Sequence, residues 1–327
     1  MGKDTRVSQY GQGFTGGLLV RGLPVSQVHP GRVFWVNNSS VLPKGGIGGS
    51  NGNDGSYLRP FSTIDYAVSQ CTADRGDMVL VMPGYAQTIT AAAEIGLDVA
   101  GVAVIGLGAG SKRPTVTFGT NATADIDVSA ANISVQNMIF IAAVASCATC
   151  FEVAAATDFT VEYCEFRDNA ATTGFINIID TNATANAADG LYFCHNRIKS
   201  LDDIAATSAL DIDETIDRMV VTDNFMVCNQ AVANTPILID AATFDLTNVE
   251  IARNLCYRLG AAETAGWLVE TSSTASTGFV YDNKGTVSDP TGILLITTGS
   301  KLGMHNNLVQ GAEDLSGFVI PAIDADA

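Results

Sequence analysis

The stretch CHNRIKSLDD holds the residues of this chain that are best suited to chemistry. It places a cationic side chain, Lys199, shortly before two carboxylates, Asp202 and Asp203. A pair of carboxylates on opposite sides of a sugar performs acid–base hydrolysis of a glycosidic bond. Neighbouring residues of an extended chain point to opposite sides, however, so Asp202 and Asp203 would point apart. We treat these three as weak candidate catalytic residues, and the alternative is an exposed loop.

A second set of carboxylates recurs at similar spacing along the chain. Each follows a short apolar stretch, as in NIID, LDID, ILID and WLVE. The members that we expect to form one acidic column are Asp180, Asp213, Asp240 and Glu270. Stacked carboxylates repel one another unless they are solvated, neutralised by a basic partner surface or bridged by cations. The sequence leaves these possibilities open and predicts no dedicated metal site.

Cys147 and Cys150 form a single CxxC pair, and no second pair accompanies them. A zinc site needs four ligands in most structural cases, so we interpret this pair as small apolar residues in a loop. The chain has seven cysteines, an odd number, which favours a reduced assembly inside a cell. We therefore predict no cofactor.

The charge balance divides the chain into a basic start and an acidic body. Formal net charge is −17, and an electrostatic footprint for nucleic acid is lacking. The first 35 residues nevertheless carry four cations and one anion, namely Lys3, Arg6, Arg21, Arg32 and Asp4. Neither a signal peptide nor a membrane span is predicted. With 47% hydrophobic residues the chain has ample material for a folded core.

One pattern recurs from residue 135 onward and indicates how the candidate residues are positioned. It reads as VQNMIF, VEYCEF, FCHNRI, VTDNFM, IARNLC, VYDNKG and MHNNLV, spaced by 24 to 32 residues. Short strands at this spacing cannot bury a face alone, but stacked coils share one core. The chain is therefore predicted to be all-β, a right-handed parallel β-helix. Its turn position is occupied by Asn196, Asn224, Asn254, Asn283 and Asn307, which we expect to adopt the left-handed conformation and to stack as a ladder of amides.

Residues 34 to 89 resemble the entry module of right-handed β-helix proteins of the pectate-lyase-like kind. In that family a strand, a Gly/Asp-rich loop, a Pro-Phe-x-Thr-Ile helix and a GD-x-V-x-V-x-PG-x-Y strand cap the first coil. The match is specific from Pro60 to Tyr85, and Ser62 with Asp65 resembles a capping box. The resemblance divides the body into an entry module with a short capping helix, 34–90, and the coils, 91–327.

The resemblance does not settle whether the chain is an enzyme, because this fold serves both enzymes and inert scaffolds. Its polysaccharide-cleaving members use clustered Asp/Glu for hydrolysis, or Arg/Lys with Ca²⁺-binding carboxylates for lyase chemistry. The only matching residues here are those of the CHNRIKSLDD stretch, and no other coil supplies an obvious facing group.

Residues 1–33 are predicted to be an extended basic docking arm. The residues expected to carry the contact are Arg6, Leu18, Leu19, Arg21, Leu23 and Arg32. A coil stack rich in Ala, Thr and Asn that bears such an arm resembles virion structural proteins of tailed bacteriophages. This resemblance implies a non-enzymatic capsid decoration protein, assembled in the host cytoplasm and commonly a homotrimer, whose partner is the major capsid protein or another virion protein.

The main alternative is a tailspike or tail-appendage polysaccharide depolymerase, acting as a lyase or hydrolase on a host surface glycan. A stand-alone cellular carbohydrate-active enzyme is the third possibility.

Overall fold

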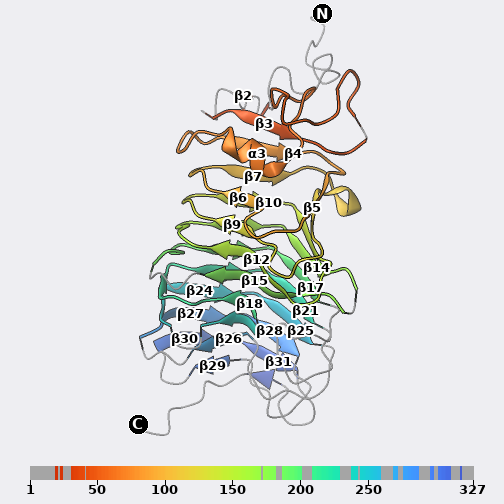
Figure 1. Ribbon diagram of the computed structural model, residues 1–327. Coiled ribbons are helices and arrows are strands. Elements are labelled where there is room, and N and C mark those ends of the chain that lie inside the picture. Colours follow the sequence, from red (N-terminus) through yellow and green to blue (C-terminus); the bar gives the residue numbers. More distant parts are fainter. Residues whose placement is uncertain are drawn as a thin grey trace, which may run out of the picture.

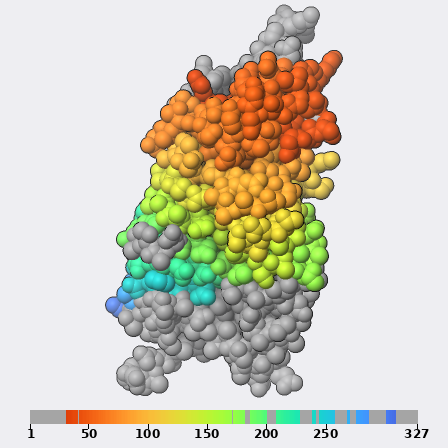
Figure 2. Space-filling model, viewed as in Figure 1, coloured from red at the N-terminus to blue at the C-terminus, as the bar shows by residue number. Residues whose placement is uncertain are grey.

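The computed structural model describes residues 19–20, 23–24, 31–40, 42–170, 172–181, 186–200, 208–228, 237–241, 244–258, 268–271, 275–286, 295–297, 301–310 and 317–318. These residues form an elongated stack of coils (Figure 1), whose strands pair in parallel with those of the coils before and after. In the space-filling view the colours follow one another along the body, as stacking in chain order requires (Figure 2). The prediction of an all-β parallel β-helix is confirmed.

Three long sheets run along the stack, with ten, ten and eight strands in the described residues. Sheet 1 contains β3 (Val33–Val36), β4 (Met78–Val81), β7 (Ala103–Gly106), β10 (Ser134–Gln136), β13 (Thr160–Glu162), β16 (Tyr192–Cys194), β20 (Val220–Thr222), β24 (Val249–Ala252), β27 (Thr277–Tyr281) and β30 (Lys301–His305). Sheet 2 contains β5 (Ala86–Ile89), β8 (Thr115–Phe118), β11 (Ile139–Ala142), β14 (Glu165–Asp168), β17 (Arg197–Ser200), β21 (Phe225–Cys228), β25 (Leu255–Arg258), β28 (Lys284–Thr286), β31 (Leu308–Gln310) and β32 (Gly317–Phe318).

Sheet 3 contains β6 (Ile95–Leu97), β9 (Ile126–Val128), β12 (Cys147–Val153), β15 (Phe175–Thr181), β18 (Ser208–Asp211), β22 (Ile237–Asp240), β26 (Val269–Thr271) and β29 (Leu295–Thr297). The remaining elements are β1 (Leu19–Val20), β2 (Leu23–Pro24), β19 (Ile216–Asp217), β23 (Leu246–Thr247), the helix α3 (Ile64–Ser69) and the 3₁₀ turn η1 (Gly110–Lys112). Strand β32 pairs with β31 in the antiparallel sense.

The core of the stack is a column of side chains that repeat from coil to coil. Phe140 on β11 and Phe166 on β14 are paired in sheet 2, Phe193 lies on β16 of sheet 1 in the following coil, and all three rings are fully buried. Their ring centroids lie 5.2 Å and 6.0 Å apart. Because each coil advances by about one strand spacing of 4.8 Å, flat rings at the same position come to lie over one another. Each such pair contributes about 0.5–1.5 kcal/mol beyond its buried area.

Helix α3 covers the N-terminal end of this column. Its residues Ile64, Ala67 and Val68 are buried, and the helix contacts β3, β4 and β6. The end of a solenoid would otherwise expose apolar side chains and unpaired strand edges, which promote aggregation. The helix therefore closes the core.

The cap of α3 differs from the predicted capping box. The side chain of Thr63, one residue later than expected, accepts the hydrogen bond from the backbone N of Tyr66 at 3.3 Å. The hydroxyl of Ser62 instead donates to Asn51 Oδ1 at 2.8 Å, and Asp65 Oδ1 accepts from the backbone N of Gly96 at 3.0 Å. Two hydroxyl residues precede the helix, and the second begins it because the first is held by the preceding loop.

The Gly-Asp pair of the entry module has a structural role. The carboxylate of Asp77 is fully buried and accepts hydrogen bonds from the backbone N of Arg32 at 2.6 Å and of Thr72 at 2.8 Å. The Arg75 guanidinium donates to both of its oxygens. Burial opposes ionisation, but these donors outweigh it and lower the pKa of Asp77. The carboxylate thus ties the start of β3 to the loop after α3.

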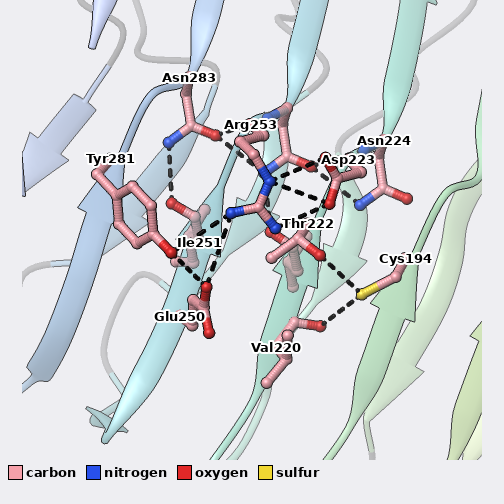
Figure 3. Close-up of polar contacts among 12 residues, drawn as sticks. Cys194, Val220, Thr222, Asp223, Asn224, Glu250, Ile251, Arg253, Tyr281 and Asn283 are labelled. Carbon is pink, nitrogen blue, oxygen red and sulfur yellow. Dashed lines mark hydrogen bonds and ion pairs between the residues drawn. The ribbon is translucent and has the colours of Figure 1, made fainter. Parts of the chain in front are cut away.

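A ladder of buried asparagines joins the coils at the turn between sheet 1 and sheet 2. Each Oδ1 accepts the backbone N–H of the ladder residue one coil earlier, and from Asn196 onward these N–O distances are 2.9–3.2 Å. Each Nδ2 donates to a sheet 1 carbonyl at 2.8–2.9 Å. The members are Asn196, Asn224, Asn254, Asn283 and Asn307, and Figure 3 includes Asn224 and Asn283.

The left-handed conformation belongs to the residue before each ladder asparagine, which corrects the sequence-based expectation. These residues have φ between 51° and 58°, and they are His195, Asp223, Arg253, Asp282 and Asn306; Tyr163, which precedes Cys164 at the equivalent position one coil earlier, has a φ of 56°. The left-handed residue turns the chain outward before the ladder position. The asparagine that follows can then direct both its backbone N–H and its amide along the stack.

The CxxC pair lies in a strand, not in the loop that we expected. Cys147 and Cys150 are both buried within β12. Burial raises the pKa of the Cys147 thiol to about 12 and that of Cys150 well above its usual value. A buried, protonated thiol is a poor nucleophile and a poor metal ligand.

The described part of residues 1–33 is not fully extended. Leu19–Val20 and Leu23–Pro24 pair as an antiparallel ladder, with Val20 opposite Leu23. A local pairing of this kind satisfies backbone groups that an extended arm would leave to solvent or a partner. Arg6, Leu18 and Arg21 lie outside the described residues, and Arg32 is exposed at the start of the body.

Replacing Asn254 by Leu is expected to lower the free energy of unfolding by about 1–3 kcal/mol. The Oδ1 of Asn254 accepts from both nitrogens of Asn224, so the change leaves a buried N–H without an acceptor. Urea unfolding followed by circular dichroism measures the loss. The control is Asn38→Leu, because Asn38 also exchanges two hydrogen bonds with a backbone, that of Ala86, but at an exposed site where water replaces them. Equal losses in both variants would contradict the ladder's role.

Candidate functional site

A row of carboxylates, the acidic ladder, runs along the outer face of sheet 3. Backbone pairing places these residues directly beside one another on successive strands. Both sequence neighbours of each are buried, so every carboxylate points outward. The members are Asp127, Glu152, Asp180, Asp211 and Asp240, and the backbone of Glu270 continues the same register.

Asp213, which the sequence analysis placed in this column, does not belong to it. Asp211 pairs with both Asp180 and Asp240, whereas Asp213 lies beyond the end of β18 and its backbone N donates to Thr181 Oγ1 at 2.9 Å. The segment LDID contains two acidic residues, Asp211 and Asp213, which are two positions apart and would therefore point to the same side of an extended strand. Parity alone could not decide between them, because only the pairing register distinguishes positions two residues apart.

The carboxylates of the ladder raise one another's pKa values. For Asp211, burial is the main cause and the charges of Asp180, Asp213 and Asp240 add to it, which brings its pKa to about 6. The amide of Asn177 donates to Asp211 Oδ2 at 2.8 Å and partly offsets the rise.

The pKa values of two further ladder members rise for the same reasons. For Asp180, burial comes first and the charge of Asp213 second. For Glu152, burial is followed by the charges of Asp125 and Asp180. The ladder therefore concentrates negative charge, and among the residues that the structure places no ion pair involves Asp127, Glu152, Asp180 or Asp211.

The adjoining sheet 2 carries the opposite charge on its outer face. Arg167 on β14 pairs with Lys199 on β17, so two cations lie side by side. Arg197 is exposed on the same strand as Lys199, and its guanidinium lies 5.4 Å from the ring centroid of Phe225. We call Arg167, Arg197 and Lys199 the basic strip. It interrupts the surface of a chain whose net charge is −17.

Aromatic side chains flank the basic strip. Phe225 and Tyr257 meet edge to face with centroids 5.9 Å apart, and Tyr257 is 36% exposed. At the turn that precedes sheet 2, the rings of Tyr163 and His195 stack at 4.9 Å, and Tyr163 is 52% exposed. Cations next to exposed aromatic rings form a surface that can bind an anionic partner and contact its apolar parts.

The candidate catalytic residues are only partly placed. Lys199 is exposed on sheet 2 as part of the basic strip, whereas Asp202 and Asp203 lie outside the described residues. In the part of the chain that the structure describes, Lys199 makes no ion pair. Lys199 is therefore a surface residue of the basic strip.

A compensated charge network at the end of sheet 1, where the chain turns toward sheet 2, contrasts with these two faces. The Arg253 guanidinium donates to both oxygens of Asp223 at 2.8–3.2 Å and reaches the hydroxyl of Tyr281 at 3.4 Å (Figure 3). The same hydroxyl donates to Glu250 Oε1 at 2.5 Å. The hydrogen bond from Arg253 is the main cause of the lowered pKa of Asp223. Here opposite charges occupy adjacent coils, as they do not on the acidic ladder.

Sequence reasoning missed Asp127, Glu152 and Asp211 as ladder members. Their signal was present, because each stands between two apolar residues in IDV, FEV and LDI. The predicted pattern instead had the acidic residue after the apolar stretch, and this pattern favours Asp213 over Asp211. A search for an acidic residue flanked by apolar ones would have found all three.

The described residues contain no group of three or more side chains arranged to hold a metal ion. Among the helices that the structure places, none has the length and apolar character needed to cross a bilayer.

No family model and no curated protein matches the chain. Among solved structures, a protein described as rhamnogalacturonan lyase is similar with a TM-score of 0.41 and 14% identity, over 89% of this chain and 90% of that one. The GH136 lacto-N-biosidase from Eubacterium ramulus is similar with a TM-score of 0.29 and 10% identity, over 85% and 68%. At TM-scores below 0.5 these similarities do not say what this chain binds or acts on.

The variant Asp211→Asn is expected to stabilise the protein at about pH 7, by roughly 1–2 kcal/mol, and to have little effect at about pH 4. The pKa of Asp211 is higher in the folded than in the unfolded chain, so the folded state binds the proton more tightly. Stability is therefore lost as pH rises from about 4, the unfolded value, to about 6. The Asn side chain keeps an acceptor for Asn177.

Urea unfolding at both pH values measures this effect. The control is Asp98→Asn, which changes an exposed aspartate outside the ladder, just after β6. A stabilisation of the same size at both pH values, or a loss at neutral pH, would show that Asp211 is not held in a repulsive environment.

Proposed function

We propose that this protein is a structural component of a bacteriophage particle, most simply a capsid decoration protein. Residues 1–33 attach it to the major capsid protein or another virion protein, and the β-helix is the projecting body. The observation that supports this is where the chain enters the stack. β3 is the terminal strand of sheet 1, so the arm joins the body at one end of its long axis.

An attachment at this end suits a projecting rod. Helix α3 closes the core at the same end. The backbone of Arg32 is held by the buried carboxylate of Asp77, so the body is fixed directly after the arm. Whatever surface the arm binds, the coils then extend away from it. The basic charge of the arm and the acidic charge of the body favour binding of the arm, and not of the body, to an anionic surface.

A polysaccharide-binding or polysaccharide-cleaving tail protein is the second candidate, and a separate observation favours it. On one face, the exposed cations Arg197 and Lys199 lie near two aromatic rings, those of the exposed Tyr257 and the half-buried Phe225. Aromatic rings stack on sugar rings, and cations pair with acidic sugars. The carboxylates Asp202 and Asp203 follow the same strand in sequence, which keeps acid–base chemistry in this stretch as a hypothesis.

Deletion of residues 2–30 is expected to abolish binding to virions while the β-helix stays folded. The deletion ends before Gly31 because Arg32 is bonded to Asp77 and β3 begins at Val33. Charge reversal at Arg21 and Arg32 should weaken binding more at low than at high salt, since salt already screens these charges. Co-sedimentation with particles measures occupancy, and Lys301→Glu, far along the body, is the control. A deletion variant that binds at full occupancy would mean that the body makes the attachment.

Incubation with host capsule or lipopolysaccharide is expected to yield no new reducing ends and no unsaturated sugar products. The non-enzymatic proposal requires this result. Turnover that is lost in Lys199→Ala or Asp202→Ala, and retained in Lys301→Ala, would instead identify the second candidate as the function. Circular dichroism of each variant verifies that the coil stack is intact.

A further inference from the structure

Sheets 2 and 3 present opposite charges on adjoining faces of the same coils. Within one coil, β14 with Arg167 is followed by β15 with Asp180. In the next coil, β17 with Arg197 and Lys199 is followed by β18 with Asp211. The basic strip and the acidic ladder therefore lie at the same height along the stack.

Most of these charges form no ion pair within the described residues, although Arg167 of the strip contacts Glu165 at 3.4 Å. Among the described residues, no ion pair involves Asp127, Glu152, Asp180 or Asp211, and none involves the two cations of β17. Elsewhere on the surface, the chain does pair its charges, as Arg253 does with Asp223 at 2.8 Å. An uncompensated row of like charges costs stability, so a partner that supplies the opposite charge would be bound favourably.

We infer that the acidic ladder of one chain is a docking surface for the basic strip of a second copy of the same chain, lying alongside it with its axis parallel and in the same direction. Because both surfaces lie at the same height, no shift along the axis is needed to bring them together. The contact is heterologous, since a different face of each copy takes part, and it can therefore repeat around an axis along the stack.

Residues around the strip fit this contact. On the coils that follow the cations, the exposed ring of Tyr257 and the half-buried ring of Phe225 add apolar area. Arg167 is anchored by Glu165 at 3.4 Å, which holds its side chain along the sheet. The outer face of sheet 3 consists of short strands whose carboxylates recur at about 4.8 Å, so a row of cations with the same repeat can meet it. This inference concerns self-association and does not depend on the attachment proposed above.

Two reversed variants test the contact. Arg197→Glu with Lys199→Glu makes the strip acidic, and Glu152→Lys with Asp180→Lys makes part of the ladder basic. We expect the wild-type chain to be an oligomer at about 0.05 M salt and to dissociate towards monomer at about 0.5 M. Each reversed variant should associate at least about tenfold more weakly at low salt. Sedimentation velocity measures the number of chains.

The most decisive measurement uses a mixture of the two reversed variants. Each has two faces of like sign and should be monomeric alone. Together, the basic strip of one meets the acidic ladder of the other, and the acidic strip meets the basic ladder, so the mixture should associate again. Lys301→Glu on sheet 1 is the matched control and should associate like the wild type. Circular dichroism and thermal unfolding show that every variant is folded.

Three results would overturn the inference. A wild-type chain that stays monomeric at low salt has no such contact. An oligomer that survives both reversals is held by other residues, such as those of the arm. If strip reversal abolishes binding of an acidic polysaccharide such as polygalacturonate but leaves the oligomer intact, the strip is a glycan-binding surface instead.

Discussion

The structure depends on the fixed distance between successive coils. Parallel backbone pairing holds each coil about 4.8 Å from the next, and it does so in strict register over most of three sheets. Residues at equivalent positions of the repeat therefore become direct neighbours. An attraction or a repulsion between two identical side chains therefore recurs between every pair of successive coils that carry them. The residue type at one position of the repeat thus affects the whole body.

Two ladders show opposite results of this constraint. An amide carries both donors and an acceptor, so stacked asparagines satisfy one another, and the buried ladder from Asn196 to Asn307 stabilises the turn. A carboxylate carries only acceptors when ionised, so stacked carboxylates repel, and on the half-buried acidic ladder this repulsion adds to burial, the main cause, in raising the pKa of Asp211. The asparagine ladder can lie inside the protein because its amides have hydrogen-bond partners within the stack. The second lies on the surface, where solvent or a partner can compensate it.

The sign of the charge thus differs between the outer faces of the three sheets, as well as between the start of the chain and its body. The arm is basic, sheet 3 is acidic and sheet 2 carries the basic strip, whereas Arg253 pairs with Asp223 across the coils at the end of sheet 1. The core and the amide ladder lie inside the body, whereas the acidic ladder and the basic strip lie on its outer faces. The unpaired surface charges are then available for contacts with other molecules, which is why both proposals for function concern surfaces and not a cleft.

The architecture could be predicted from the sequence because a repeat of about thirty residues leaves few other ways to bury short apolar strands. The asparagine positions followed from the same repeat, and the Gly-Asp pair from the resemblance of the entry module. The residue that takes the left-handed conformation could not be predicted, because Asn is the residue type that best tolerates φ above zero at this turn, whereas the left-handed position is occupied in two coils by His195 and Arg253, whose types give no such signal. In the structure the residue before each asparagine takes it.

The acidic ladder shows more clearly what could not be predicted from the sequence alone. Alternation shows which residues point outward, and this is true of both Asp211 and Asp213. It does not show which of them lies beside Asp180, because positions two residues apart have the same parity. Only the pairing of β15 with β18 decided this. The common height of the basic strip and the acidic ladder was likewise decided by the coils, since charges on different strands become neighbours through register and not through sequence distance.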